Sequence, residues 1–452
     1  MTDRKQSPTN TTLSRRGFLA VGGTAAVASA LPVRAGETDG EEKKPEIVQW
    51  RKLGRTNFRV SDVSAGAGAS DSNLVRYAYD HGVNYFDTAE SYGNGEHERV
   101  IGGAMQHMDR SKIFITTKLV LKEEDTEQTI MDRYAKSLER LKTSYADALF
   151  MHAVSKTDTI KNEAFHKAVA KLKTDGKLRH GGISCHGPRE EGEDSLSKVL
   201  LAAVEDGRFD LMLLSYNFMN KDEAERVLTA CRTANIGTTA MKTAPCAVEL
   251  PEWDPENPTG PLLKYIERKE DEGQSREKSI QEIEQWLASQ KAEYEKTAPF
   301  REKYGITSPT ELRVTAAKWV LQNPDMHTIC LGMRDFEQVD RFVALSGTRL
   351  TVADNHFLDD YRVAHNSLYC RHGCSDCFDA CREKLPISTI MRYSYYFTGQ
   401  GREKEAMGKY ARLALNDGSK CLDCDATCNG ACPHGIDIRS NVLSAHSLLT
   451  IA

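Results

Sequence analysis

From about Trp50 to Arg349, short apolar runs alternate with longer segments in which apolar residues recur every three or four positions. The short runs begin near residues 63, 83, 112, 147, 178, 209, 236 and 327. Near-continuous apolar strands are expected when both faces of a parallel sheet are buried, and helical segments between them supply the crossovers. Eight such units predict an α/β fold, a (β/α)8 TIM barrel over residues 50–355.

An open, doubly wound sheet is the alternative for this alternation of strands and helices. Its first strand would end in the G-x-G-x-x-G turn that binds a dinucleotide. The first predicted strand, VSAGAG, is followed by ASDS, which does not complete that turn. We therefore favour the barrel.

One connection is too long for a simple crossover. Residues 243–310 begin with a proline-rich stretch and continue into a charged, helix-prone stretch. Long loops of a barrel usually lie at its catalytic mouth or form solvated decoration. The sequence predicts a helical insertion near the mouth, with most of its charge facing water.

The N-terminal part of the chain lacks the alternating pattern of the barrel. Residues 1–35 combine the run SRRGFLA with small residues at which a peptidase could cut, which predicts a twin-arginine signal peptide followed by an acidic linker at 36–49. A disordered basic tail is the alternative to a signal peptide for residues 1–35. No other stretch is apolar enough to predict a membrane span. We expect export to the periplasm or another extracytoplasmic space.

The 452 residues carry a formal charge of only -5, which does not indicate a nucleic-acid-binding surface.

Candidate catalytic residues lie at the ends of three consecutive predicted strands. Asp87 ends the second strand and Tyr92 follows it, Lys118 ends the third, and His152 ends the fourth. Because the strands of a barrel end at one rim, these four side chains are expected to meet there.

The four residue types fit proton transfer to a carbonyl oxygen. Tyrosine is a weak acid with a pKa of about 10, and the ammonium of Lys118 should lower that pKa. Asp87 can hold the lysine charged and in place, while His152 can donate a hydrogen bond to the same oxygen and orient it. For any one of these residues, an ordinary polar residue at a strand end is the structural alternative.

The stretches LGRTNFRVS, FDTAESYGNGEHERVIG, FITTK, MHA and LGMRDFEQV make residues 50–350 similar to the aldo/keto reductase family. This resemblance implies an NADP(H)-dependent oxidoreductase that interconverts a small carbonyl compound and its alcohol. It assigns the catalytic roles to Asp87, Tyr92, Lys118 and His152, with Tyr92 as general acid.

The same resemblance implies the cofactor site. At the phosphate end, Gly332, Arg334 and Gln338 match the family, whereas Arg341 and Phe342 stand where an acidic residue and an asparagine belong. An exposed rim position is the alternative for Arg334.

Near the nicotinamide, Ser184 matches a residue that contacts the amide, but its polar neighbour is replaced by Cys185. Leu213 replaces a glutamine that is frequent in the family, and Met241 and Lys242 stand where many members have an aromatic residue. We expect Lys242 to face phosphate, with an exposed rim position as the alternative.

Eight of the twelve cysteines lie in the last ninety residues, in two sets of four. Iron-sulfur clusters are held by four thiolates, and a proline often follows the last of them. The sets predict two [4Fe-4S] clusters, and the last cysteine of each set could serve the other cluster. Two zinc sites or short-range disulfides are the alternatives. The predicted ligands are Cys370, Cys374, Cys377, Cys381, Cys421, Cys424, Cys428 and Cys432.

Helical periodicity around these cysteines predicts a small all-α domain over residues 356–452, and this segment resembles the ferredoxin-like segment that follows the barrel in some aldo/keto reductases. Only the second set has a proline directly after its last cysteine, at Pro433. Export and clusters are compatible, because proteins that use the twin-arginine route fold and take up cofactors before they cross the membrane.

Two functions remain open at this point. The first is an oxidoreductase whose clusters exchange electrons with a redox protein partner or merely brace the terminal domain. The second is an exported electron-transfer or redox-sensing subunit whose barrel binds a small molecule without turning it over.

Overall fold

The computed structural model describes residues 44–450 except 189–192, 220, 244–252, 272, 296–297, 306–309, 369, 372–373, 399–402 and 414–415. The predicted signal peptide at 1–35 lies outside the described residues, as does most of the linker predicted at 36–49.

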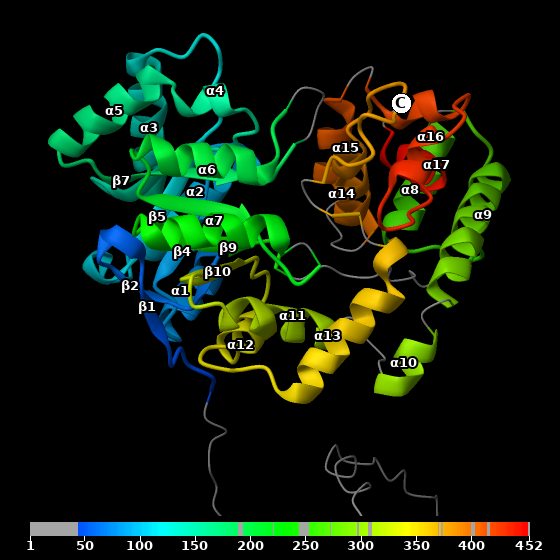
Figure 1. Cartoon of the computed structure of the whole chain (residues 1–452), viewed down its shortest axis with the longest axis horizontal. Coiled ribbons are helices and arrows are strands. Elements are labelled where there is room, and N and C mark those ends of the chain that lie inside the picture. The colour runs from blue at the N-terminus through cyan, green and yellow to red at the C-terminus, as the bar shows by residue number, and fades with distance from the viewer. Residues whose placement is uncertain are drawn as a thin grey trace, which may run out of the picture. The chain divides into compact units, whose positions relative to one another are not determined.

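Eight parallel strands close into a barrel in the order β10-β3-β4-β5-β6-β7-β8-β9, which confirms the predicted TIM barrel (Figure 1). Each strand overlaps one of the eight apolar runs recognised in the sequence. The barrel strands are β3 (Val63–Ala65), β4 (Tyr85–Asp87), β5 (Phe114–Leu119), β6 (Ala146–Met151), β7 (Leu178–Cys185), β8 (Leu211–Ser215), β9 (Gly237–Met241) and β10 (Thr328–Leu331).

A short hairpin that the sequence analysis did not predict precedes the barrel. Strands β1 (Trp50–Lys52) and β2 (Arg59–Ser61) pair antiparallel. Leu53, which directly follows β1, and Val60, which lies in β2, are buried against residues of the barrel interior. A Cβ at Gly54 would lie 2.3 Å from the backbone nitrogen of Gly237, at the start of β9. The hairpin therefore covers the end of the barrel where the strands begin.

Amphipathic helices surround the strands (Figure 1). In α3 (Glu127–Leu141), Thr126 caps the first turn, and Ile130, Tyr134 and Leu138 recur at helical spacing on the buried side. The other helices around the barrel are α1 (Ser72–Asp80), α2 (Glu96–Met105), α4 (Thr157–Ile160), α5 (Glu163–Thr174), α6 (Leu196–Asp206), α7 (Asp222–Thr233), α11 (Thr310–Gln322), α12 (Phe336–Val343) and α13 (Val352–Ala364).

The described part of the insertion at 243–310 is helical, with α8 (Gly260–Asp271), α9 (Arg276–Glu295) and α10 (Ala298–Tyr304). Its apolar side chains are not all turned toward the barrel. Trp286 of α9 packs against the core of the cysteine-rich segment, and Tyr265 Oη of α8 lies 3.2 Å from Ser447 Oγ of that segment. The insertion thus supports the C-terminal segment.

A separate apolar core holds the cysteine-rich segment together. It joins α14 (Ile387–Thr398), α15 (Glu403–Ala411) and α17 (Ile438–Leu449), and the short helices η6 (Gly418–Cys421) and α16 (Thr427–Ala431) carry cysteines. The helical character predicted for this region is therefore present. Within the described part of the chain, no helix is both long and apolar enough to cross a membrane.

Candidate active site and cysteine groups

Four ionisable side chains meet at the rim where β4, β5 and β6 end. Lys118 donates hydrogen bonds to the Asp87 carboxylate and to the backbone oxygen of Thr88, the latter at 2.7 Å. Its Nζ is 3.4 Å from Tyr92 Oη. The rings of Tyr92 and His152 lie edge to face, with centroids 5.6 Å apart. Adjacent parallel pairing of β4, β5 and β6 brings these residues together, because their strands end side by side.

Burial controls the electrostatics of this group. Lys118 has no exposed surface. Burial alone would lower the pKa of Lys118, but the charges of Asp87 and Tyr92 raise it above its ordinary value. Burial also raises the pKa of the Asp87 carboxyl, against the opposing effect of Lys118. Lys118 and Asp87 form an ion pair, because the lysine and the carboxylate are in direct contact.

The expected lowering of the phenol pKa is not the net result. Burial raises the pKa of Tyr92 to about 12, and the positive charge of Lys118 offsets only part of that rise. The sequence could not reveal this balance, because the cost of desolvation depends on the whole fold. The phenol is consequently fully protonated at neutral pH, which is the form that can donate a proton.

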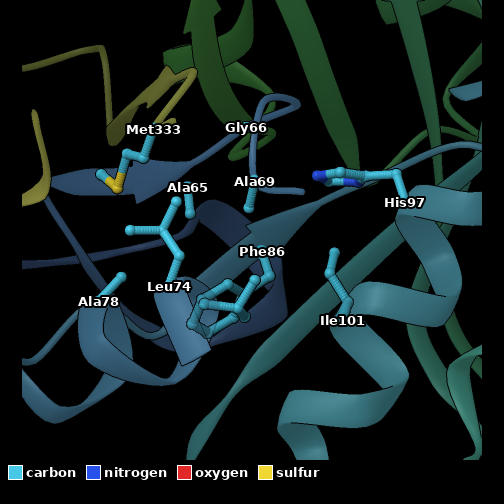
Figure 2. Close-up of a pocket in the computed structure, with 10 residues that line it drawn as sticks. Ala65, Gly66, Ala69, Leu74, Ala78, Phe86, His97, Ile101 and Met333 are labelled. Atoms are coloured by element: carbon cyan, nitrogen blue, oxygen red, sulfur yellow. The ribbon is translucent and has the colours of Figure 1, made fainter. Parts of the chain in front are cut away.

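His97 is a neighbour of the site that the sequence analysis missed. Its Nδ1 lies 2.9 Å from Thr88 Oγ1, and its ring lies edge to face with Tyr92 at 6.1 Å. Burial, followed by the charge of Lys118, lowers the pKa of His97 to about 4. The imidazole points toward Ala69 across a small pocket that is otherwise apolar (Figure 2). The stretch YGNGEHE, which places this histidine five residues after Tyr92, was the available signal.

Cys330 on β10 was also overlooked, because its run reads as an ordinary buried strand. Its thiol interacts electrostatically with Asp87 and Lys118, and burial raises its pKa well above the usual value. A Cβ at Gly66 would lie 2.9 Å from Cys330 Sγ, so a larger residue there would press on this thiol.

Two of the predicted cofactor residues have partners within the protein. Ser184 is buried, and its Oγ accepts a hydrogen bond from the Ala153 backbone at 2.7 Å, directly after His152. Lys242 follows β9, and its Nζ contacts the Tyr396 hydroxyl rather than solvent alone. Lys242 is half-buried at this position.

The other three predicted cofactor residues lie at the start of α12. A Cβ at Gly332 would approach the Ala67 oxygen to 2.6 Å, so two rim loops touch there. Gln338 Oε1 accepts a hydrogen bond from the Arg334 backbone at 3.2 Å, and Asp335 caps the helix. The Arg334 residue is exposed at this rim.

A profile of the Aldo/keto reductase family matches residues 67–361. The chain belongs to the aldo/keto reductase family. It is therefore an oxidoreductase by family, and all four rim residues and the start of α12 fall within the matched region.

Individual relatives of this aldo/keto reductase are distant. A putative voltage-gated potassium channel subunit beta of Schizosaccharomyces pombe is 26% identical over 326 residues, which cover 66% of this chain and 87% of the relative. A probable aldo-keto reductase of Glycine max is 24% identical over 332 residues, covering 68% and 87%. A Bacillus halodurans aldo-keto reductase solved in its holo form is 19% identical with a TM-score of 0.50, covering 72% and 99%.

The eight C-terminal cysteines of this aldo/keto reductase lie beyond the matched region and gather in two groups that mix the two sequence sets. Cys370, Cys374, Cys377 and Cys432 line one pocket. Burial, followed by the charges that Cys374, Cys432 and Cys428 would carry, raises the pKa of Cys377 to about 12. The first group thus takes its fourth thiol from the second set.

The second group forms around Cys421. Burial, followed by the charges that Cys381, Cys424 and Cys428 would carry, raises the pKa of Cys421 to about 11. Cys381 and Cys424 raise the pKa of Cys428 in the same way, after burial. The fourth thiol here comes from the first set. The spacing of the cysteines in the sequence did not decide whether the last cysteine of each set belongs to the other group.

The described cysteines are all free thiols, and none is paired in a disulfide within this part of the chain. In the same residues, no three His, Cys, Asp or Glu side chains converge closely enough to hold a single metal ion. Zinc requires its sulfur ligands at about 2.3 Å from one point, whereas an iron-sulfur cluster places several iron and sulfide atoms between its thiolates.

Proposed function

We propose that this aldo/keto reductase interconverts a small carbonyl compound and its alcohol by hydride exchange with NADP(H), with Tyr92 as general acid and base. The observation that carries this proposal is the continuous contact from Asp87 through Lys118 to Tyr92, with the ring of His152 beside the phenol.

The roles of the four residues follow from their contacts. The protonated Tyr92 donates its proton to the carbonyl oxygen as the carbon accepts a hydride, which is what the nicotinamide supplies when bound. Lys118 stabilises the phenolate that remains, and Asp87 keeps the ammonium charged and fixed. His152 would donate a second hydrogen bond to the reacting oxygen, which its position beside the Tyr92 ring supports. In the reverse direction the Tyr92 phenolate accepts the proton of the alcohol.

The start of α12 fits the phosphate end of such a cofactor. Exposed Arg334 supplies a cation, and Gly332 has no side chain that could obstruct the cofactor. Backbone N–H groups at a helix start favour anions, although Asp335 already caps this one. Ser184 and Lys242 would hold the nicotinamide end and a phosphate, each after exchanging part of its present contacts.

We further propose that the two thiol groups each hold a [4Fe-4S] cluster. Support comes from the chemistry of the donors, because each group offers four sulfur atoms in largely apolar surroundings. The clusters would carry single electrons to or from a redox partner, or brace the segment. We also propose export by the twin-arginine route, supported by the run SRRGFLA near the N-terminus.

Anaerobic purification of the exported protein tests these proposals together. Heat should release NADP(H), and iron and sulfide assays should give about eight of each per chain, as two cubane clusters require. The protein should also oxidise NADPH in the presence of a simple aldehyde. Bound nucleotide without turnover of aldehydes or alcohols would favour the binding subunit over the enzyme. Absence of iron after anaerobic reconstitution would refute the clusters.

A further inference from the structure

Helix α14 (Ile387–Thr398) has the first thiol group on one side and a set of buried polar residues on another. Ile387 and Met391, four residues apart, line the pocket that contains Cys370, Cys374, Cys377 and Cys432. Residues with this spacing share one face of a helix. One side of α14 is therefore occupied by the thiols.

The opposite side of α14 carries three polar residues. Thr389, Arg392 and Tyr396 follow one another at helical spacing. At about 100° per residue, Thr389 and Tyr396 lie on the side away from Met391, and Arg392 lies at the edge of that side. Tyr396 Oη contacts Lys242 Nζ, and the Tyr396 ring centroid is 4.5 Å from the same Nζ. Because Lys242 directly follows β9, this side of α14 meets the rim at which the strands of the barrel end.

Two side chains on this polar side are buried with unsatisfied atoms. Thr389 is 1% exposed, and its Oγ1 has no hydrogen-bond partner among the described residues. Arg392 is 7% exposed, and its Nε also has none in that part of the chain. A contact of its guanidinium carbon with the Tyr393 ring, at 5.6 Å, does not satisfy this N–H group.

An arginine buried in this way is costly unless an anion accompanies it. No carboxylate forms an ion pair with Arg392 within the described residues. The first thiol group lies along the side of α14 that carries Ile387 and Met391, not along the side that carries Thr389 and Tyr396. Because the polar side of α14 meets the barrel rim through Tyr396 and Lys242, a ligand bound at that rim can supply the negative charge.

We propose that Thr389, Arg392 and Tyr396, together with Lys242, form a subsite for an oxyanion of a small molecule bound at the barrel rim. Arginine and lysine supply charge, and the guanidinium can hold a carboxylate or phosphate through two parallel hydrogen bonds. The threonine and tyrosine hydroxyls add donors. This inference rests on the proposed function for the identity of that molecule. The oxyanion is either a carboxylate of the substrate or a phosphate of NADP(H).

Thermal unfolding of the full-length protein after removal of bound nucleotide, with and without sodium pyrophosphate or sodium benzoate, tests the subsite without any turnover. At least one of these anions should raise the melting temperature of the wild type. Arg392→Gln should abolish that rise, whereas the control Arg412→Gln, which alters an exposed arginine of the same segment, should keep it. Thr389→Val and Tyr396→Phe should each reduce it, which provides an answer even if Arg392→Gln does not fold.

Kinetics then distinguish the two sources of the oxyanion. For a substrate carboxylate, Arg392→Gln should lower kcat/KM for 4-carboxybenzaldehyde by about tenfold or more, while kcat/KM for its methyl ester stays nearly constant. For a cofactor phosphate, both substrates should be affected alike and the Kd for NADPH should rise about tenfold.

The subsite is refuted if neither anion stabilises the wild type, or if the folded variants keep the anion response, the substrate preference and the NADPH affinity of the wild type. An enzyme without reductase activity would refute the proposed function only, because the response of the melting temperature to anions would still decide on the subsite.

Discussion

The rim of the barrel and the cysteine-rich segment both gather reactive side chains, but they balance charge in different ways. At the rim, Lys118 and Asp87 compensate each other, so the protein itself supplies both signs. Among the thiols, burial and then the neighbouring sulfurs raise the pKa of Cys370, and the opposing charge of Arg371 does not reverse this rise. The pair of Asp87 and Lys118 is therefore balanced without an added ion, whereas the thiol groups need an added cation to carry negative charge.

The largest expected effect tests the rim alone. Tyr92→Phe keeps the ring packed against His152 and removes the proton that is transferred. We expect kcat for aldehyde reduction to fall by about 10² to 10⁴-fold, the usual contribution of a general acid. Steady-state oxidation of NADPH measures this loss, and the iron content of the variant should equal that of the wild type. Unchanged turnover would show that the rim does not perform the chemistry.

The next effect concerns charge balance at the rim. Lys118→Met leaves the Asp87 carboxylate buried without its cation, which should lower the free energy of unfolding by about 3 to 5 kcal/mol. The double variant Lys118→Met and Asp87→Asn should recover much of that loss, because no buried charge remains. Urea unfolding followed by circular dichroism compares the three proteins. Equal stability of Lys118→Met and the wild type would contradict internal compensation.

The thiol groups can be tested by iron content. Cys432→Ser should reduce iron from about eight to about four atoms per chain, since one cluster is lost. Adding Cys374→Ser should remove little more, because both cysteines lie in one group. Adding Cys424→Ser instead should remove nearly all iron, because that residue belongs to the group around Cys421.

If each cluster is instead held by four cysteines that are close in sequence, the two double variants should exchange their results. The variant with Cys374→Ser should then lose nearly all iron, and the variant with Cys424→Ser should lose little more than Cys432→Ser alone. Iron and sulfide assays after anaerobic reconstitution measure all three proteins. Reduction of aldehydes by NADPH should persist in each of them, because no cysteine of either group contacts the rim tetrad.

These two regions also differ in how much of them could be predicted. The barrel and the meeting of Asp87, Tyr92, Lys118 and His152 followed from the pattern, because parallel strands deliver their ends to one rim. The hairpin of β1 and β2 did not, because strands of three residues leave too little periodicity.

Other features depend on distances that no local pattern encodes. The exchange of thiols between the two sets needs the packing of α14 and α17 around them. The contact of Lys242 with Tyr396 joins residues 154 positions apart, and the raised pKa of Tyr92 reflects burial by the whole barrel.

The smallest effect that we expect concerns the acid sensitivity of the rim. His97 has a pKa of about 4 in the folded protein, because burial and Lys118 disfavour its charged form, whereas an unfolded chain gives about 6.5. Between these values the unfolded state binds a proton that the folded state does not, so stability falls as the pH falls. His97 alone should contribute up to about 1.4 kcal/mol of this fall per pH unit. Urea unfolding of the wild type and His97→Gln at pH 7 and pH 5 isolates the effect, since the other buried histidines contribute equally to both proteins. A variant as acid-sensitive as the wild type would mean that His97 is charged in the fold, and the rim would then hold a positive charge that its own residues do not balance.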